Sequence, residues 1–193
     1  MDGISQIITQ QLAGPASRQI ASRLGISEST ANTAIQLAVP LLLAALARNA
    51  SKPQGADALH QAVANDHDGS ILDNLGSYLG NPGGANGAGI LGHVLGPQRT
   101  TTESNLAQAT GLDQGTTQNL MELIAPVVLG AVGRTQHQNG LDSSGLAQYL
   151  GHEQEQQQQA APGMMGMLTS ILDSNKDGSV TDDLSRIAGG FLK

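Results

Sequence analysis

The sequence lacks cysteine and has very few aromatic residues. Without cysteine the chain can form no disulfide, no thiolate metal site and no cysteine nucleophile. Tryptophan is also absent, and with one Phe and two Tyr the core must come from Leu, Ile, Val, Ala and Met, in a chain that is 39% hydrophobic. Such a core favours helices over a sandwich of sheets. The composition therefore predicts a globular, all-α protein.

Basic residues are also scarce. Nine Lys and Arg against 16 Asp and Glu give a net charge of −7, which is the wrong sign for a general attraction to nucleic acid or to anionic lipid. The N-terminus carries neither a basic leader nor a long apolar run, and no stretch reaches the roughly 18 apolar residues that a membrane-spanning helix needs. We expect a cytoplasmic protein with no membrane span and no nucleic acid as partner.

An internal repeat is the most informative pattern in the chain. The stretch LGISESTANTAIQLAVPLLLAALAR, residues 24–48, matches TGLDQGTTQNLMELIAPVVLGAVGR, residues 110–134, without a gap. Pro40 falls on Pro126 and Arg48 on Arg134. This agreement predicts a duplicated helical unit whose two copies pack against each other, because neither can bury its apolar face alone.

Each copy of the repeat begins like a helix-turn-helix. A Gly-hydrophobe turn precedes Ser27 or Asp113, which are natural N-caps, and a long apolar helix follows. In a DNA-binding protein the second helix would read the major groove. Residues 27–39 contain no Lys or Arg, however, so we interpret the pattern as packing geometry. A DNA-associated regulator that uses this segment is the alternative function.

The rest of the chain divides into short helices and connections. We expect a first helical repeat over residues 1–80, a Gly-rich linker over 81–102 and a second repeat over 103–150. A Gln-rich linker over 151–163 and a C-terminal helical hairpin over 164–193 complete the predicted order. Shorter helices are expected at residues 4–12, 16–24, 56–64, 70–79, 103–109, 143–150, 164–172 and 181–192.

The stretch LDSNKDGSVTDDLSRI, residues 172–187, begins like an EF-hand calcium loop. Acidic or amide side chains alternate before a glycine at the sixth position, which is the spacing of oxygen ligands around calcium. The glutamate expected at position 12 is replaced by Leu184, so the loop is shortened and an acid at the start of the next helix would take its place. The predicted calcium ligands are Asp173, Asn175, Asp177, Ser179, Asp182 and Asp183.

A weaker copy of this loop lies in ANDHDGSILDNLGSYL, residues 64–79. Its aligned residues predict a second metal site formed by Asp66, Asp68, Ser70 and Asp73, which fall on Asn175, Asp177, Ser179 and Asp182. Ala64 stands at its first ligand position and removes one carboxylate. In both copies the competing interpretation is that the Asp-Gly-Ser segment only turns the chain and that a following Asp caps a helix.

We find no catalytic pattern in the sequence. The five histidines share no metal-binding spacing, no Ser lies in a nucleophile elbow, and the glycine-rich GANGAGILGH has no following Lys-Ser/Thr. The sequence therefore predicts a protein that is not an enzyme.

The duplicated LGIS…P…LLLAALAR unit, the DHDGSILDNLG and GILGHVLG stretches and the closing LDSNKDGSVTDDLSRIAGGFL together resemble the bacterial YidB-like family, domain of unknown function 937. The resemblance covers nearly the whole chain. It implies an all-helical bacterial protein with homeodomain-like helical units and implies no activity. We therefore expect a non-enzymatic protein that binds calcium and mediates protein–protein or self-association. Its expected partner is another copy of the same chain, in a homo-oligomer, or another protein.

Overall fold

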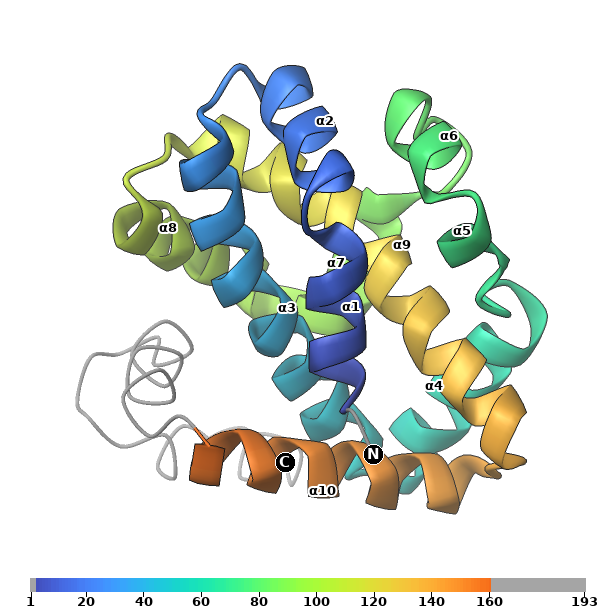
Figure 1. Ribbon diagram of the computed structural model, residues 1–193. Coiled ribbons are helices and arrows are strands. Elements are labelled where there is room, and N and C mark those ends of the chain that lie inside the picture. The colour runs from blue at the N-terminus through green and yellow to red at the C-terminus, as the bar shows by residue number, and fades with distance from the viewer. Residues whose placement is uncertain (1–2, 161–193) are drawn as a thin grey trace.

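The computed structural model describes residues 3–160, and every regular element in this range is a helix. The expectation of an all-α fold is confirmed there (Figure 1). In chain order the elements are α1 (Ile4–Leu12), α2 (Pro15–Leu24), α3 (Glu28–Ala50), α4 (Pro53–Asn65), α5 (Ser70–Asp73), α6 (Leu75–Gly80), α7 (Gly87–Leu95), the 3₁₀ turn η1 (Gly96–Gln98), α8 (Arg99–Thr110), α9 (Gln114–Asn139) and α10 (Ser143–Ala160).

The two longest helices, α3 and α9, begin where the sequence places their caps. The hydroxyl of Ser27 accepts a hydrogen bond from the backbone N–H of Thr30 at 3.0 Å. Asp113 Oδ1 accepts one from the N–H of Thr116 at 2.9 Å. Each bond satisfies a backbone donor that the first helical turn leaves without a partner. The two predicted N-caps are therefore confirmed.

A left-handed glycine precedes each of these caps. Gly25 ends α2 with φ of 68°, and Gly111 ends α8 with φ of 71°. A residue with a side chain adopts this conformation at a cost, whereas glycine adopts it freely. These glycines stop α2 and α8 and redirect the chain into α3 and α9.

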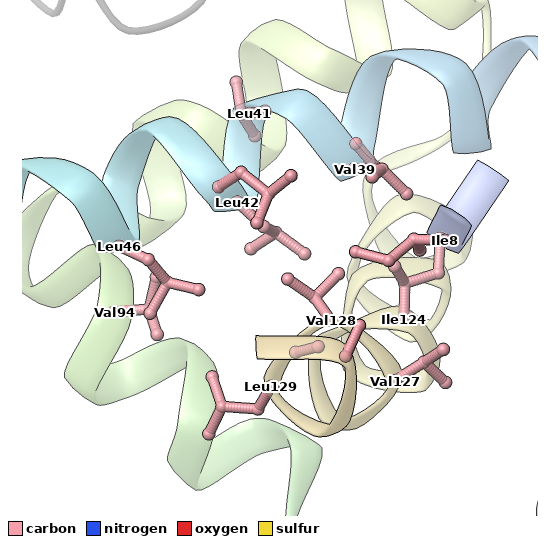
Figure 2. Close-up of a cluster of buried hydrophobic side chains, with 14 of the residues drawn as sticks. Ile8, Val39, Leu41, Leu42, Leu46, Val94, Ile124, Val127, Val128 and Leu129 are labelled. Atoms are coloured by element: carbon pink, nitrogen blue, oxygen red, sulfur yellow. The ribbon is translucent and has the colours of Figure 1, made fainter. Parts of the chain in front are cut away.

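The core forms around the middle of α3 and α9. Figure 2 shows Leu42 of α3 and Val128 of α9 pointing toward one another, while Leu46 lies beside Val94 of α7; each of these side chains is buried. Removal of such a side chain from water stabilises the fold by about 1.5–3 kcal/mol. Burial on all sides explains why both helices are apolar around most of their circumference.

The predicted Gly-rich linker over residues 81–102 is instead largely helical. Within it α7 buries Ile90, Leu91 and Leu95 in the core, and α8 already begins at Arg99. Gly87 lies so close to the carbonyl of Glu122 that a Cβ atom there would overlap the oxygen. The glycines that suggested flexibility permit close packing against α9.

The predicted Gln-rich linker also begins as a helix, because α10 continues to Ala160. Its residue Glu153 is only 6% exposed and accepts a hydrogen bond from the backbone N–H of Ser5 at 3.2 Å. This bond ties α10 to the start of α1. In Figure 1 α10 crosses beneath α3 and α4, and its last turn lies on the side of α3. The calcium hairpin predicted over residues 164–193 lies outside the described residues.

Candidate functional site

The acidic loop, residues 66–69, connects α4 to α5 and contains part of the weaker predicted metal site. Asp68 Oδ1 accepts a hydrogen bond from the backbone N–H of Ser70 at 2.9 Å, which closes a tight turn. Hydrogen bonds from Ser70 hold the pKa of the Asp68 carboxyl below its ordinary value. Asp68 therefore serves the local backbone as the acceptor of this turn.

Two glycines of α9 receive the loop and the start of α5. A Cβ atom at Gly133 would overlap the backbone carbonyl of His67, and one at Gly130 would press into the side chain of Ile71. The loop thus lies closer to the α9 backbone than it could if Gly130 or Gly133 carried a side chain. This close approach fixes the position of the acidic loop.

Arg134 of α9 binds the C-terminal end of the acidic loop. Its Nη2 donates to the carbonyl of Gly69 at 2.7 Å and lies 2.6 Å from Asp73 Oδ1. Gly69 is buried with φ of 96°, a backbone conformation that suits glycine. The guanidinium thus holds both a backbone oxygen and the carboxylate of α5.

The structure does not gather Asp66, Asp68, Ser70 and Asp73 around one point. Asp68 faces the turn and Asp73 faces Arg134. Within residues 3–160 no three His, Cys, Asp or Glu side chains are grouped so that they could hold a metal ion. This arrangement corresponds to the competing interpretation of the segment, a chain turn. Asp173, Asn175, Asp177, Ser179, Asp182 and Asp183 lie outside the described residues.

A groove with a volume of about 1060 Å³ opens beside the acidic loop. We call it the α4–α7 groove, because several residues of these two helices line it, together with residues of α3, α5, α6 and α9. Its apolar lining comes from Leu46, Leu59, Ile71, Ile90, Pro126 and Leu129, and its polar lining includes Asn49, His67, Asn86 and His93. Binding pockets commonly combine an apolar lining with a few polar groups in this way.

The sequence did not predict this groove, because one of its walls is α7. Residues 81–102 appeared to be a linker, and the signal that could have revealed a wall was the apolar pairing of Ile90 with Val94 and Leu91 with Leu95 at helical spacing. Asn86 adds a cap, since its Oδ1 accepts a hydrogen bond from the N–H of Gly89 at 3.2 Å. The frequent glycines obscured both signals.

Two titratable side chains that line the groove, His67 and Tyr78, have shifted pKa values. Burial lowers the pKa of His67, although the nearby Asp66 and Asp68 oppose this shift. Burial raises the pKa of Tyr78 to about 12, and its hydroxyl donates to the carbonyl of Leu123 at 2.9 Å. Both side chains are therefore neutral at physiological pH, so the charge along this part of the groove comes from the acidic loop.

The helix-turn-helix segment places α2 and α3 on either side of Gly25. The exposed side chains at the start of α3 include Glu28, Ser29 and Thr33, which offer no positive charge. Arg23 of α2 turns toward the carbonyl of Gly80, to which its Nη1 donates at 3.3 Å. The start of α3, where a recognition helix would contact DNA, therefore carries no base to pair with a phosphate.

By length and composition α3 could also cross a membrane, and it is the one such helix among the described residues. Most of its apolar stretch is buried by the other helices. The core helix of a globular protein has these same properties.

Half-buried arginines differ in their partners. Arg99 lies 2.6 Å from Glu103 and 2.7 Å from Glu122, and these ion pairs connect α8 to α9. Arg48 of α3 donates through Nη1 to the neutral side-chain oxygen of Gln98 at 2.8 Å, and burial lowers its pKa. Among residues 3–160 no carboxylate forms an ion pair with Arg48.

Comparison with known proteins identifies one family. A family model described as a bacterial protein of unknown function (DUF937) matches residues 6–135, which include both long helices and the acidic loop. No curated protein and no solved structure matches the chain.

Proposed function

We propose that this chain, which belongs to the DUF937 family of bacterial proteins, is a non-enzymatic helical protein that binds calcium through its C-terminal loop and mediates protein–protein or self-association. The observation that carries the association is the α4–α7 groove, an open and mainly apolar hollow of about 1060 Å³. An extended apolar hollow on a protein surface commonly marks a site where another chain binds.

The lining of the groove favours an apolar segment of a protein as its occupant. Leu59, Ile90 and Leu129 provide side chains against which aliphatic residues can pack, while Asn49 and Asn86 can hydrogen-bond to a backbone. Asp66 and Asp68 at one end would favour a partner with a basic residue there. A second copy of this chain is the simplest source of such a segment, because it carries apolar helices of the same kind.

Calcium binding rests on residue chemistry in the C-terminal loop. Asp173 supplies a carboxylate at the position where the weaker copy has Ala64, so this loop has one more hard oxygen ligand than the acidic loop. The remaining ligands are Asn175, Asp177 and Ser179, with Asp182 or Asp183 replacing the missing glutamate. The acidic loop would then be a structural relative of the C-terminal loop that has lost metal binding.

Light scattering over a range of protein concentrations tests the association. The wild type should form a dimer or a larger assembly at high concentration, and Ala62→Arg, which places a charge on the groove wall, should weaken it. Ala109→Arg is the matched control, because Ala109 is an exposed alanine of α8 that does not line the groove. A strict monomer at every concentration, with and without calcium, would contradict the proposal.

Isothermal titration calorimetry of the metal-free protein with calcium tests the second part. We expect one binding event in the wild type and none in Asp177→Ala, which removes the ligand at position 5 of the loop. Asp68→Ala should bind like the wild type, because Asp68 accepts a hydrogen bond within its own turn. Equal binding by Asp177→Ala and the wild type would assign the calcium site elsewhere.

A further inference from the structure

The lining of the α4–α7 groove carries opposite charges at the two ends of α4. Lys52, the N-cap of this helix, contributes a base, while Asp66, its C-cap, and the nearby Asp68 contribute acids. The helix holds the two groups roughly 20 Å apart, at ~1.5 Å per residue. Lys52 and Asp66 are exposed, and neither side chain forms an ion pair or a hydrogen bond with a residue of the range 3–160. Both charges are therefore open to a partner.

Small side chains lie between these charges on the wall that α4 contributes. Ala58 is exposed and Ala62 is half-buried, and both line the groove. Residues four positions apart are neighbours on one face of a helix, and Asp66 continues the same spacing. Small side chains at a contact between two helices permit an interaxial distance at the short end of the usual 8–10 Å. This face of α4 can therefore receive another helix closely.

The helix α4 has the charge pattern that an occupant of its own groove needs. A complementary helix must bring a base to the acidic end and an acid to the end with Lys52. Since a base precedes α4 and acids follow it, a second α4 meets both needs when it runs in the opposite direction. We propose that α4 of a second copy docks in the α4–α7 groove, antiparallel to α4 of the first copy and related to it by a two-fold axis. This inference rests on the association proposed above and specifies its geometry.

The two-fold axis determines which residues meet. When Ala58 of one copy faces Ala62 of the second copy, an antiparallel pair of identical helices places Lys52 opposite position 68 of the second copy. The long side chain of Lys52 then reaches Asp68 or Asp66 there. The contact is the same from both sides, so this ion pair forms twice. The positive N-terminal end of each helix also lies beside the negative C-terminal end of the other.

Apolar burial and charge have separate roles in this contact. Exposed ion pairs contribute little to affinity, so most of it must come from apolar surface removed from water. Leu59, Ile90 and Leu129 provide that surface in the groove, and the charges select the direction and register of the helix. In Figure 1 α4 lies at the edge of the helical bundle, where a second copy can approach it. Because a two-fold contact closes on itself, the expected assembly is a dimer.

Charge reversal in the full chain tests the contact. Lys52→Glu and Asp66→Lys each place like charges together at two symmetric positions, and each should raise the dissociation constant of the dimer by about tenfold. Both changes suit the dipole of α4, with an acid at its N-terminal end and a base at its C-terminal end, so the helix should remain folded. Asp57→Lys is the matched control, because Asp57 is exposed on α4 but does not line the groove. Analytical ultracentrifugation measures the constants, and circular dichroism verifies the helix content.

Mixing the two variants tests the direction of the helices. An equal mixture of Lys52→Glu and Asp66→Lys brings opposite charges together at both symmetric contacts, so it should associate about as tightly as the wild type. The double variant Lys52→Glu/Asp66→Lys should also recover. A parallel pair would place Lys52 beside Lys52 of the second copy, so neither combination would restore its attraction.

Disulfide trapping tests the register, because the natural chain has no cysteine. Ala58→Cys mixed with Ala62→Cys should form a disulfide between the two copies under mild oxidation. Ala58→Cys mixed with Ala109→Cys is the control, since Ala109 is an exposed residue of α8 that does not line the groove. Equal yields in the two mixtures would overturn the proposed register.

The results separate this geometry from association itself. A wild type that stays monomeric at every concentration would contradict both proposals. An assembly that Lys52→Glu, Asp66→Lys and Asp57→Lys leave equally tight would retain the association and overturn the antiparallel contact of α4. The same conclusion would follow if the mixture of Lys52→Glu with Asp66→Lys failed to recover.

Discussion

Gly133 of α9 lies against the backbone carbonyl of His67, in contact too close to admit a Cβ atom. The position of the acidic loop therefore depends on the absence of one methyl group. Gly133→Ala must push the loop away from α9 or distort the helix, and we expect it to lower the free energy of unfolding by about 1–3 kcal/mol. Thermal or urea unfolding followed by circular dichroism measures this loss.

Gly92→Ala is the matched control for this substitution. Gly92 also lies inside a helix, but a Cβ atom there would meet nothing within 4 Å. Alanine should therefore stabilise the protein by up to about 1 kcal/mol through its higher helix propensity. If both substitutions shift the unfolding midpoint in the same direction, the contact between Gly133 and His67 does not determine stability.

Arg134 should contribute more to the stability of the fold than its carboxylate partner Asp73 does. The Asp73 side chain is 66% exposed, so Asp73→Asn should cost only about 0.2–1 kcal/mol of stability. Arg134→Ala also leaves the carbonyl of buried Gly69 without its donor and should cost more, about 1–3 kcal/mol. Urea unfolding of the two variants compares these values, and equal losses would show that the bond to Gly69 contributes nothing.

Local signals in the sequence predicted most of the helices, and their ends most clearly. Ser27 and Asp113 are caps because of their own side chains, and α1 spans residues 4–12 as its spacing predicts. These features depend on residues within one or two turns of each other. They could therefore be read without knowledge of the tertiary structure.

Features that depend on distant contacts were not predictable in this way. The glycines of α7 suggested a linker, although Gly87 permits close contact with Glu122. The acidic loop resembled a metal site, although Arg134 binds its end from a helix far along the chain. Glycine-rich and acidic stretches have the same local pattern whether they are solvated or docked, and tertiary contacts decide between the two.

The charge of Asp113 should make the free energy of unfolding depend on pH in the acidic range. Hydrogen bonds from the side chain and backbone of Thr116 lower the pKa of Asp113 in the folded state. Its stabilising effect is therefore present above the ordinary pKa of 3.8 and is lost as pH falls through the lower folded value. Asp113→Asn keeps a capping oxygen without the charge, so it should lose less stability between neutral pH and this acidic range. Urea unfolding across that range tests the difference, and parallel profiles would argue against it.

Calcium should stabilise the full chain if the Asp173 loop binds it. Binding to the folded state adds on the order of 2.7 kcal/mol at a hundredfold excess over the dissociation constant, so the melting temperature should rise. Asp177→Ala should abolish this rise and Asp68→Ala should leave it nearly unchanged. Magnesium, which demands stricter octahedral geometry, serves as the ion control. A rise that survives in Asp177→Ala would reject the loop as the site.

The hydroxyl of Tyr78 offers a probe of the contact between α6 and α9. It donates to the carbonyl of Leu123 of α9 at 2.9 Å. Tyr78→Phe should cost about 0.5–1.5 kcal/mol. Tyr149→Phe is the matched control, because Tyr149 lies partly exposed on α10. Urea unfolding compares the two, and equal losses would mean that the bond to Leu123 is not stabilising.

Ionisation of the Tyr78 hydroxyl at alkaline pH offers a second test of its burial. Burial raises the pKa of Tyr78 to about 12 from its ordinary 10.0. Because the folded state holds the proton more tightly, the stability linked to Tyr78 is fully present below pH 10 and is lost as pH rises toward about 12. With two tyrosines in the chain, tyrosinate absorbance in Tyr149→Phe reports Tyr78 alone. Its titration should coincide with alkaline unfolding followed by circular dichroism; ionisation at the ordinary pKa in a fully helical protein would show that the hydroxyl is open to solvent and that α6 does not seal this side of α9.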